Sequence, residues 1–161
     1  MRRIIRWHEL VTDDARYAGE EAGIETRPVQ PAAEFIAALA GQTAGSGAAI
    51  LIGPGDELEP LAPHLALLSL IVVDFPKIGE GRGFSQARML RQRYRYAGEL
   101  RARGALKRDQ LFFLARCGFD SFDLDPTEDL QAALAALNDF SVAYQDGSDA
   151  VVKVQRRAGS A

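Results

Sequence analysis

The stretch SLIVVDFPKIGEGRGFSQARMLRQRYRYAGELRAR (residues 69–103) decides the fold. Residues 69–75 are an apolar run that predicts a buried strand, and Gly98 precedes a second strand at 98–103. Between them, the pattern over 83–94 predicts a helix with one apolar side, formed by Phe84, Ala87, Met89, Leu90 and Tyr94. A strand, a helix and a strand in this order are typical of a parallel β-α-β unit.

The same alternation continues toward the C-terminus. An apolar stripe over 106–117 predicts a helix, Gly118 fits its end, and DSFDL (120–124) predicts the next strand. The final helix is expected to start with Asp125 as N-cap, Pro126 at the first helical position and Glu128 two residues later. Together these segments predict consecutive parallel units with helices mainly on one side.

Upstream of this region the pattern is weaker. A short helix fits 31–41, a strand fits 48–53, and prolines break the segment at 57–68. We expect a single domain over 1–161, with a poorly readable segment at 1–46, a repeat core at 47–138 and a C-terminal segment at 139–161. Within that last segment, VVKVQ is expected either to form a hairpin strand or to fray, and the tail to be mobile.

Polar residues alternate with apolar ones in the second and third strands of the core. In one strand Glu99, Arg101 and Arg103 share a face, and in the next Ser121, Asp123 and Asp125 share a face. A sheet with helices on both faces would be apolar throughout. The alternation therefore predicts a half-barrel-like or open α/β sheet, whose charged face lines a cleft or a subunit interface. A full eight-unit barrel needs about 250 residues and does not fit.

The charge of the chain is unevenly distributed. The net charge is −3, yet residues 77–116 hold 11 Lys/Arg against 3 Asp/Glu. One positive face indicates either an anionic ligand or an acidic partner, whereas solvation of helix surfaces is the simpler explanation. The arginines lack an interleaved aromatic platform, which argues against nucleic acid.

Several classes of site are disfavoured by composition. The lone Cys117 excludes an intramolecular disulfide and Cys-rich metal sites, and it is expected to be a packed side chain. His8 and His64 are too far apart in sequence to suggest a metal centre. No apolar run is long enough to span a membrane or to act as a signal peptide, so we expect a cytoplasmic protein without cofactors.

The loop PKIGEGRG (76–83) lies where β-α proteins place ligands, after the end of a strand. It is neither G-x-G-x-x-G nor a P-loop, so a nucleotide fingerprint is absent. It is either a glycine-rich turn or an anion-binding loop in which Lys77, Arg82 and Arg101 converge on one small oxyanion. The candidate anion-binding residues are Lys77, Arg82, Ser85, Arg101, Arg103 and Arg108. The supporting residues are Asp74, Gly81, Gly83, Glu99, Asp109, Gln110 and Asp123.

Two other chemistries receive less support. Ser85 lacks a G-x-S-x-G elbow, which disfavours a serine hydrolase. Asp74, Asp123 and Asp125 are hard oxygen ligands for a cation, but helix capping and pairing with Arg101 or Arg103 explain the last two equally well. We therefore expect no metal.

DFPKIGEGRGFSQARMLR, GELRARG and RDQLFFLARCGFDSFDL, within residues 47–125, resemble a bacterial family of unknown function. Its members are labelled as oxidoreductases of sulfite reduction because their genes lie beside those of assimilatory sulfite reductase. The resemblance draws attention to Asp74, Phe75, Pro76, Gly81, Arg82, Gly83, Ser85, Arg88, Glu99, Arg101, Arg108, Asp109 and Gln110.

The resemblance implies an accessory protein of assimilatory sulfate or sulfite reduction, binding an oxyanion or an acidic redox partner such as sulfite reductase. The chain is not itself a sulfite reductase, because one cysteine cannot hold an iron–sulfur cluster. The alternatives are a small half-barrel enzyme acting on an anionic substrate and a structural oligomerisation module. We expect a homo-oligomer that binds neither nucleic acid nor membrane.

Overall fold

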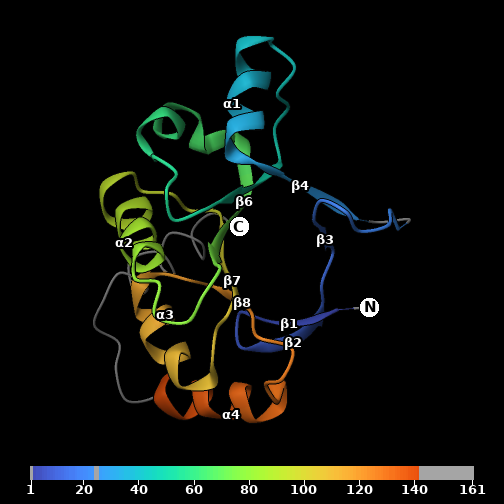
Figure 1. The fold of residues 1–161 in the computed structure, drawn as a ribbon. Helices are drawn as coiled ribbons and strands as arrows, with labels where there is room; N and C mark the ends of the chain where they lie inside the picture. The colour runs from blue at the N-terminus through green and yellow to red at the C-terminus, as the bar shows by residue number, and fades with distance from the viewer. Residues whose placement is uncertain (1, 24–25, 142–161) are drawn as a thin grey trace, which may run out of the picture.

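A computed structural model of the chain describes residues 2–23 and 26–141. The described residues form an eight-stranded sheet and the helices that cover it (Figure 1). The strands are β1 (Arg3–Arg6), β2 (Glu9–Thr12), β3 (Ala15–Arg16), β4 (Arg27–Pro31), β5 (Ala48–Ile52), β6 (Leu68–Phe75), β7 (Glu99–Gly104) and β8 (Ser121–Asp123). The α-helices are α1 (Ala32–Ala40), α2 (Arg82–Arg88), α3 (Leu111–Cys117) and α4 (Leu130–Ser141). Two 3₁₀ segments, η1 (Glu59–Leu67) and η3 (Arg108–Gln110), and a π-helical turn, η2 (Met89–Arg93), complete the list.

The sheet has the strand order β2-β1-β8-β7-β6-β5-β4-β3. From β3 through β8 every neighbouring pair is parallel, while β1 pairs antiparallel with both β8 and β2. The predicted parallel units at 69–137 are therefore confirmed. The predicted α/β half-barrel class is confirmed as well, because the sheet is open and strongly curled.

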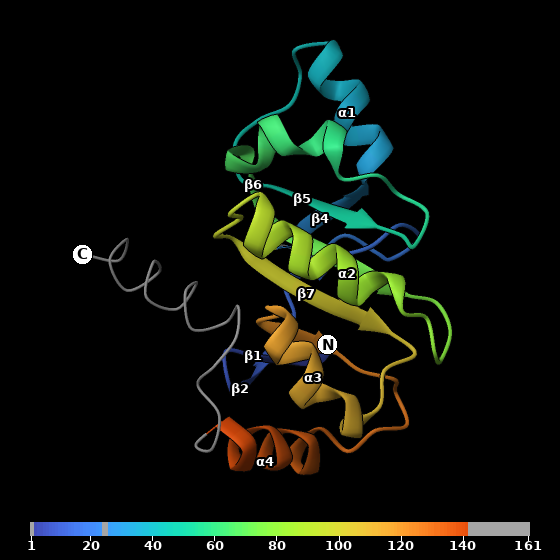
Figure 2. The same cartoon turned by 90° about the vertical axis from the view of Figure 1, so that its left-hand side faces the viewer.

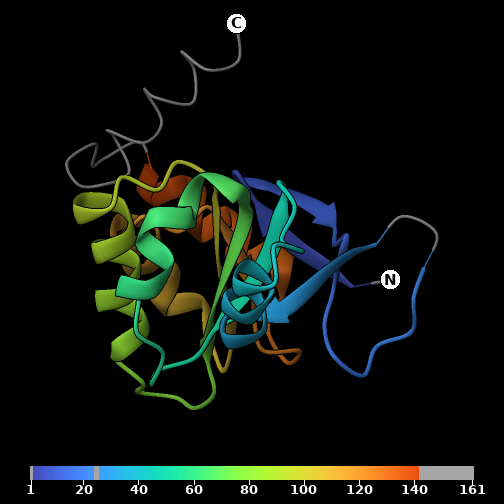
Figure 3. The ribbon, with the colours of Figure 1, turned by 90° about the horizontal axis from the view of Figure 1, so that it is seen from above.

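The curl follows from the chain itself. The two edge strands, β2 and β3, are joined by only Asp13 and Asp14. Three peptide steps from Thr12 to Ala15 span at most about 11 Å. Eight flat strands would instead hold their edges roughly 34 Å apart. The sheet must bend until one end of β2 meets one end of β3, as seen from above in Figure 3.

The helices cover the outer, convex face of the sheet (Figure 2). Ile71, Val73 and Phe75 of β6 point into this larger core, together with Leu100, Ala102 and Phe122 of the neighbouring strands. The intervening residues Leu70 and Val72 point to the inner face and pack with Ala15, Tyr17, Val29 and Ala49. The prediction of helices on one side thus holds, and the inner face is left to strands and loops.

The start of α4 differs from the prediction. Asp129, and not Asp125, caps this helix, because its carboxylate accepts hydrogen bonds from the backbone N–H groups of Gln131 and Ala132. Asp125 instead closes a turn by accepting from the backbone N–H and the hydroxyl of Thr127. An aspartate carboxylate before Pro-Thr can accept hydrogen bonds from the following residues either in a turn or at the start of a helix. In this chain the turn forms.

The first 46 residues supply four strands and α1, of which only the helix was predicted, at 31–41. The strands are short, and three of the four contain arginine, so they lack the apolar runs that identified β5 and β6. Cys117 is fully buried, as predicted, and burial raises the pKa of its thiol. The predictions for VVKVQ and for the mobile tail concern residues outside the described ranges.

Candidate functional site

The inner face of the sheet is apolar on one half and charged on the other. β5 and β6 contribute Ala49, Leu70 and Val72. In the strand register, Leu70 and Val72 pair with Glu99 and Arg101 of β7. Arg101 and Arg103 pair on their other side with Ser121 and Asp123 of β8. The alternation in the sequence predicted this shared face. Because the sheet curls inward, the charged half lies mostly inside the molecule.

Arg101 lies at the centre of this charged half, and none of its surface is exposed. One terminal nitrogen, Nη1, donates to Asp13 Oδ1 at 2.7 Å, and the other, Nη2, donates to Glu99 Oε1 at 2.9 Å. Nε completes the set with a 3.3 Å bond to Ser121 Oγ. A buried guanidinium with every nitrogen engaged is a structural group, and its ligands are the protein's own carboxylates.

Arginines from the first strands neutralise the same carboxylates. Arg6 and Arg27 both contact Glu99, at 3.2 and 3.5 Å, and Arg2 contacts Asp13 at 2.9 Å. Burial alone would raise the pKa of Glu99, but the charge of Arg101 and the hydrogen bond from Ser121 outweigh it, so this pKa lies below its ordinary value. Glu99 is therefore ionised at neutral pH and is held in place from three sides.

Arg103 differs from these arginines. Its guanidinium donates no hydrogen bond to any described residue, and its only ion pair with one of them is a 3.4 Å contact between Nε and Asp123 Oδ2. The guanidinium carbon lies 3.6 Å from the centre of the Tyr17 ring, a stacking distance. The side chain is 29% exposed. Tyr17 thus holds a forked donor in place, and the two terminal nitrogens of Arg103 donate to no residue of the described ranges.

Asp74 of β6 pairs in register with Arg103 of β7, and Asp123 of β8 pairs with Arg103 from the other side. Its half-buried carboxylate makes no hydrogen bond or ion pair within residues 2–23 and 26–141. Burial raises the pKa of Asp74, and the nearby charge of Arg103 offsets this only in part. Burial likewise raises the pKa of Asp123, against the charges of Arg2 and Arg103. Asp74, Arg103, Asp123 and Tyr17 are called the carboxyl-edge cluster below.

The structure distributes the predicted anion-binding residues over three places. Arg103 lies in the carboxyl-edge cluster with Asp74 and Asp123, and Arg101 is sealed beside it with Glu99. Lys77, Arg82 and Ser85 are exposed, on the loop after β6 and on α2. A small ion held by Lys77 and Arg82 therefore reaches Arg101 only if it displaces Asp13 or Glu99. Gly81 is also exposed, whereas Gly83 is buried against the ring of Phe75.

A family model described as a bacterial protein of unknown function (DUF934) matches residues 49–154, about two thirds of the chain. The chain belongs to this family. The DUF934 match begins in β5 and includes Asp74, Arg103 and Asp123, whereas Tyr17 and Asp13 precede it. Neither the curated proteins nor the solved structures include a match to the chain.

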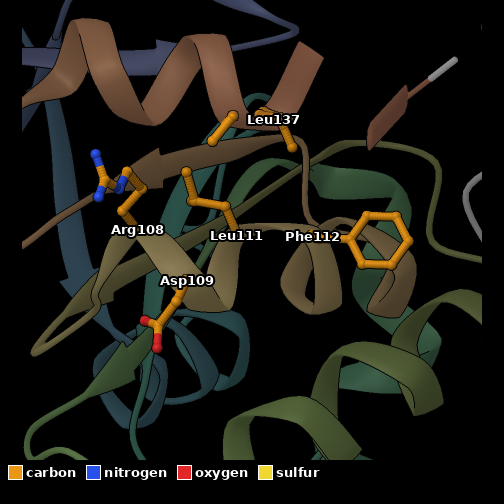
Figure 4. Close-up of a pocket in the computed structure, with 6 residues that line it drawn as sticks. Arg108, Asp109, Leu111, Phe112 and Leu137 are labelled. Atoms are coloured by element: carbon orange, nitrogen blue, oxygen red, sulfur yellow. The ribbon is translucent and has the colours of Figure 1, made fainter. Parts of the chain in front are cut away.

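Also within the DUF934 region, Arg108, Asp109 and Gln110 form η3, and each has a local role or environment. The backbone N–H of Arg108 donates to Glu128 Oε2 at 3.1 Å, and Gln110 Oε1 accepts from the backbone N–H of Lys107 at 2.9 Å. Arg108 and Asp109 border a small pocket between α3 and α4, with a volume of about 100 Å³. In Figure 4 their side chains point in different directions, and Leu111 and Leu137 face each other. Ligand pockets are typically several times larger, so this one is a packing crevice.

Sequence reasoning missed Arg2, Asp13 and Tyr17, the three N-terminal residues that complete the charged interior. The apolar pairs in RRIIR and in ELVT were the available signals for β1 and β2. Within the described ranges, no group of three or more His, Cys, Asp or Glu residues is arranged to hold a metal ion. None of the helices in those ranges combines the length and the apolar character that a membrane span needs.

Proposed function

We propose that this protein is an accessory protein of assimilatory sulfate or sulfite reduction that binds a small oxyanion through Arg103. The observation that carries the proposal is the stacked, partly exposed guanidinium that has no hydrogen-bond acceptor among the described residues. The pathway assignment rests on the resemblance described in the sequence analysis. The chemistry of binding rests on the carboxyl-edge cluster.

The guanidinium of Arg103 suits an oxyanion for geometric reasons. Asp123 lies at Nε, so the two terminal nitrogens remain to form a forked pair of bonds to two oxygens of one anion. Stacking on Tyr17 orients this fork before the ligand arrives, which reduces the entropy lost on binding. The carboxyl ends of parallel strands are also where β-α folds most often bind ligands.

Replacing Arg103 with alanine should weaken sulfate and sulfite binding at least tenfold, because hydrogen bonds to charged groups contribute about 1.5–3 kcal/mol each. Isothermal titration calorimetry would measure the dissociation constants. Arg3→Ala, at an exposed arginine of β1, is the matched control and should bind like the wild type. Wild-type protein that gives no heat with either anion, or Arg103→Ala that binds equally well, would contradict the proposal.

The pathway assignment can be tested separately, in cells that carry the same variants. A deletion strain grown on sulfate should be rescued by the wild-type gene and by Arg3→Ala, but poorly by Arg103→Ala, with added cysteine restoring growth in all cases. Unchanged growth of the deletion strain would overturn the pathway assignment while leaving the binding result standing.

The affinity for sulfate should rise as the pH is lowered toward and through the raised pKa of Asp74. Protonation removes a negative charge beside Arg103 and adds an O–H donor. Asp74→Asn is uncharged at every pH and should bind sulfate more tightly at neutral pH, with a weaker pH dependence. Calorimetry between pH 4.5 and 8 would measure both. Equal pH dependence in the wild type and Asp74→Asn would assign the effect to another group, with Asp123 the first to test.

Asp74 also favours a second candidate, a small half-barrel enzyme acting on an anionic substrate. A carboxyl group with a raised pKa beside an anion-binding arginine is suited to proton transfer. If Asp74→Asn binds sulfate well yet fails to rescue growth, the enzyme is favoured over the binding protein.

A further inference from the structure

The ion pairs of the inner face form one connected network, and its charges balance. Among the described residues this inner ion-pair network joins five arginines to five carboxylates. The arginines are Arg2, Arg6, Arg27, Arg101 and Arg103, and the carboxylates are Asp13, Asp14, Glu20, Glu99 and Asp123. When these groups are ionised, the protein's own carboxylates match every arginine of the network.

Asp74 adds a sixth carboxylate beside this balanced network. It pairs in register with Arg103, so both side chains lie on the inner face of the sheet. The charge of Arg103 acts on Asp74, yet the same guanidinium already has its ion pair with Asp123. With all of these groups ionised, the network and Asp74 together carry one excess negative charge.

The other polar groups near Arg103 do not offset this excess. Arg2 lies 2.7 Å from Glu20 and 3.5 Å from Asp123, so its charge is matched as well. The guanidinium carbon of Arg2 also lies 4.8 Å from the centre of the Tyr17 ring, on which Arg103 stacks. Burial raises the pKa of Tyr17, so its phenol is neutral at neutral pH. These groups therefore supply no surplus positive charge for a ligand.

Two forms of oxyanion would meet this edge differently. A fully deprotonated oxyanion such as sulfate can accept from the fork of Arg103, but it has no proton for Asp74 and sets negative charge against that carboxylate. An oxyanion that keeps a proton presents an O–H group, which can donate to Asp74 while the other oxygens accept from Arg103. A ligand that leaves a polar group of its site unpaired is strongly disfavoured.

We propose that the carboxyl-edge cluster selects oxyanions that carry a proton at neutral pH, with the carboxylate of Asp74 accepting the hydrogen bond from their O–H group. The inference rests on the proposed binding of an oxyanion through Arg103. Of the two anions considered there, it favours hydrogensulfite over sulfate. Asp74 is then the residue that determines specificity, and Arg103 the residue that supplies affinity.

Phosphate and sulfate are a matched pair of probes, because both are small tetrahedral oxyanions and only phosphate keeps a proton at neutral pH. In calorimetry of the full-length protein at about pH 7.5, phosphate should bind at least about tenfold more tightly than sulfate. Sulfite, which is partly protonated at this pH, should follow phosphate. The preference should shrink as the pH falls through the raised pKa of Asp74, since the protonated carboxyl group can itself donate to sulfate.

Asp74→Asn tests the assignment to this residue, because an amide can donate to either anion. The preference for phosphate should fall to about twofold or less. Asp139→Asn makes the same change at an exposed position of α4 and should keep the preference of the wild type. Circular dichroism would verify that both variants are folded. The comparison of anions in the wild type needs no variant and tests the selectivity by itself.

The other outcomes separate this inference from the proposed function. Equal affinities for phosphate and sulfate in the wild type, or tighter binding of sulfate, overturn the selectivity and leave oxyanion binding through Arg103 standing. An unchanged preference in Asp74→Asn overturns the role of Asp74. Sulfite that binds as weakly as sulfate contradicts the class of ligand, because the preference is then for phosphate alone. Absence of heat with all three anions overturns the proposed function and this inference together.

Discussion

Replacing Arg101 with methionine should lower the free energy of unfolding by about 3 kcal/mol or more at neutral pH. Removing one partner of a buried ion pair leaves the opposite charge in a medium that solvates it badly. Here Asp13 and Glu99, whose side chains are 0% and 6% exposed, lose their central cation. Methionine fills similar space, so the loss is of charge rather than of volume. Urea denaturation followed by circular dichroism would measure the change.

The pH dependence of that loss distinguishes charge from packing. In the wild type the lowered pKa of Glu99 means that its carboxylate contributes stability above the ordinary value of about 4.3, which is lost as the pH falls. In Arg101→Met, burial should raise this pKa, so the stranded carboxylate is neutralised at a higher pH. The stability difference between the two proteins should therefore narrow below about pH 5. A stability difference that stays constant with pH would assign the effect to packing. The control Arg3→Met should have almost the stability of the wild type at every pH.

Replacing Gly104 with alanine should cost about 3 kcal/mol, through the backbone rather than through charge. Gly104 ends β7 with φ of +126°, and a Cβ there would overlap the carbonyl oxygen of Phe75 in the neighbouring strand. Both effects force the ends of β6 and β7 apart. Thermal unfolding would measure the loss. Gly55→Ala is the matched control, because Gly55 is exposed and has open space around its Cα.

A result for Gly104→Ala within about 0.5 kcal/mol of the wild type would contradict the conformation described for this strand end. Because Asp74 and Arg103 directly precede Phe75 and Gly104, the same substitution should also disturb the carboxyl-edge cluster. Sulfate affinity would then fall along with stability, while Gly55→Ala would change neither.

The fold of the core could be predicted because period-two alternation is a geometric property of strands. Glu99, Arg101 and Arg103 share a face in any strand, so the polar side of β7 followed from the sequence before the helices were placed. The parallel arrangement followed from the length of the connections, since the predicted helices at 83–94 and 106–117 separate the three strands. These inferences need no knowledge of distant contacts.

The rest depended on contacts between residues far apart in sequence. Nothing in the segment around Asp13 indicates that its carboxylate ends beside Arg101, because that pairing exists only once the sheet has curled. The predicted convergence of Lys77, Arg82 and Arg101 assumed that the arginine was accessible, whereas Asp13 and Glu99 seal it. Asp125 illustrates a local limit: its side chain suits a helix cap and a turn equally, and the position of the helix decides between them.

The pairing of β1 with β8 sets the order in which the chain can assemble during synthesis. β1 can pair with β2 at once, but Ile5 pairs with Phe122, so β1 finds its other neighbour, β8, only after more than a hundred further residues have been made. At translation rates of about 5–20 residues per second, this delay lasts on the order of ten seconds. Until Arg101 has been made, Asp13 also lacks the buried arginine with which it pairs in the folded chain. The hairpin of β1 and β2 is thus made before β8 but joins the rest of the sheet only after β8 exists.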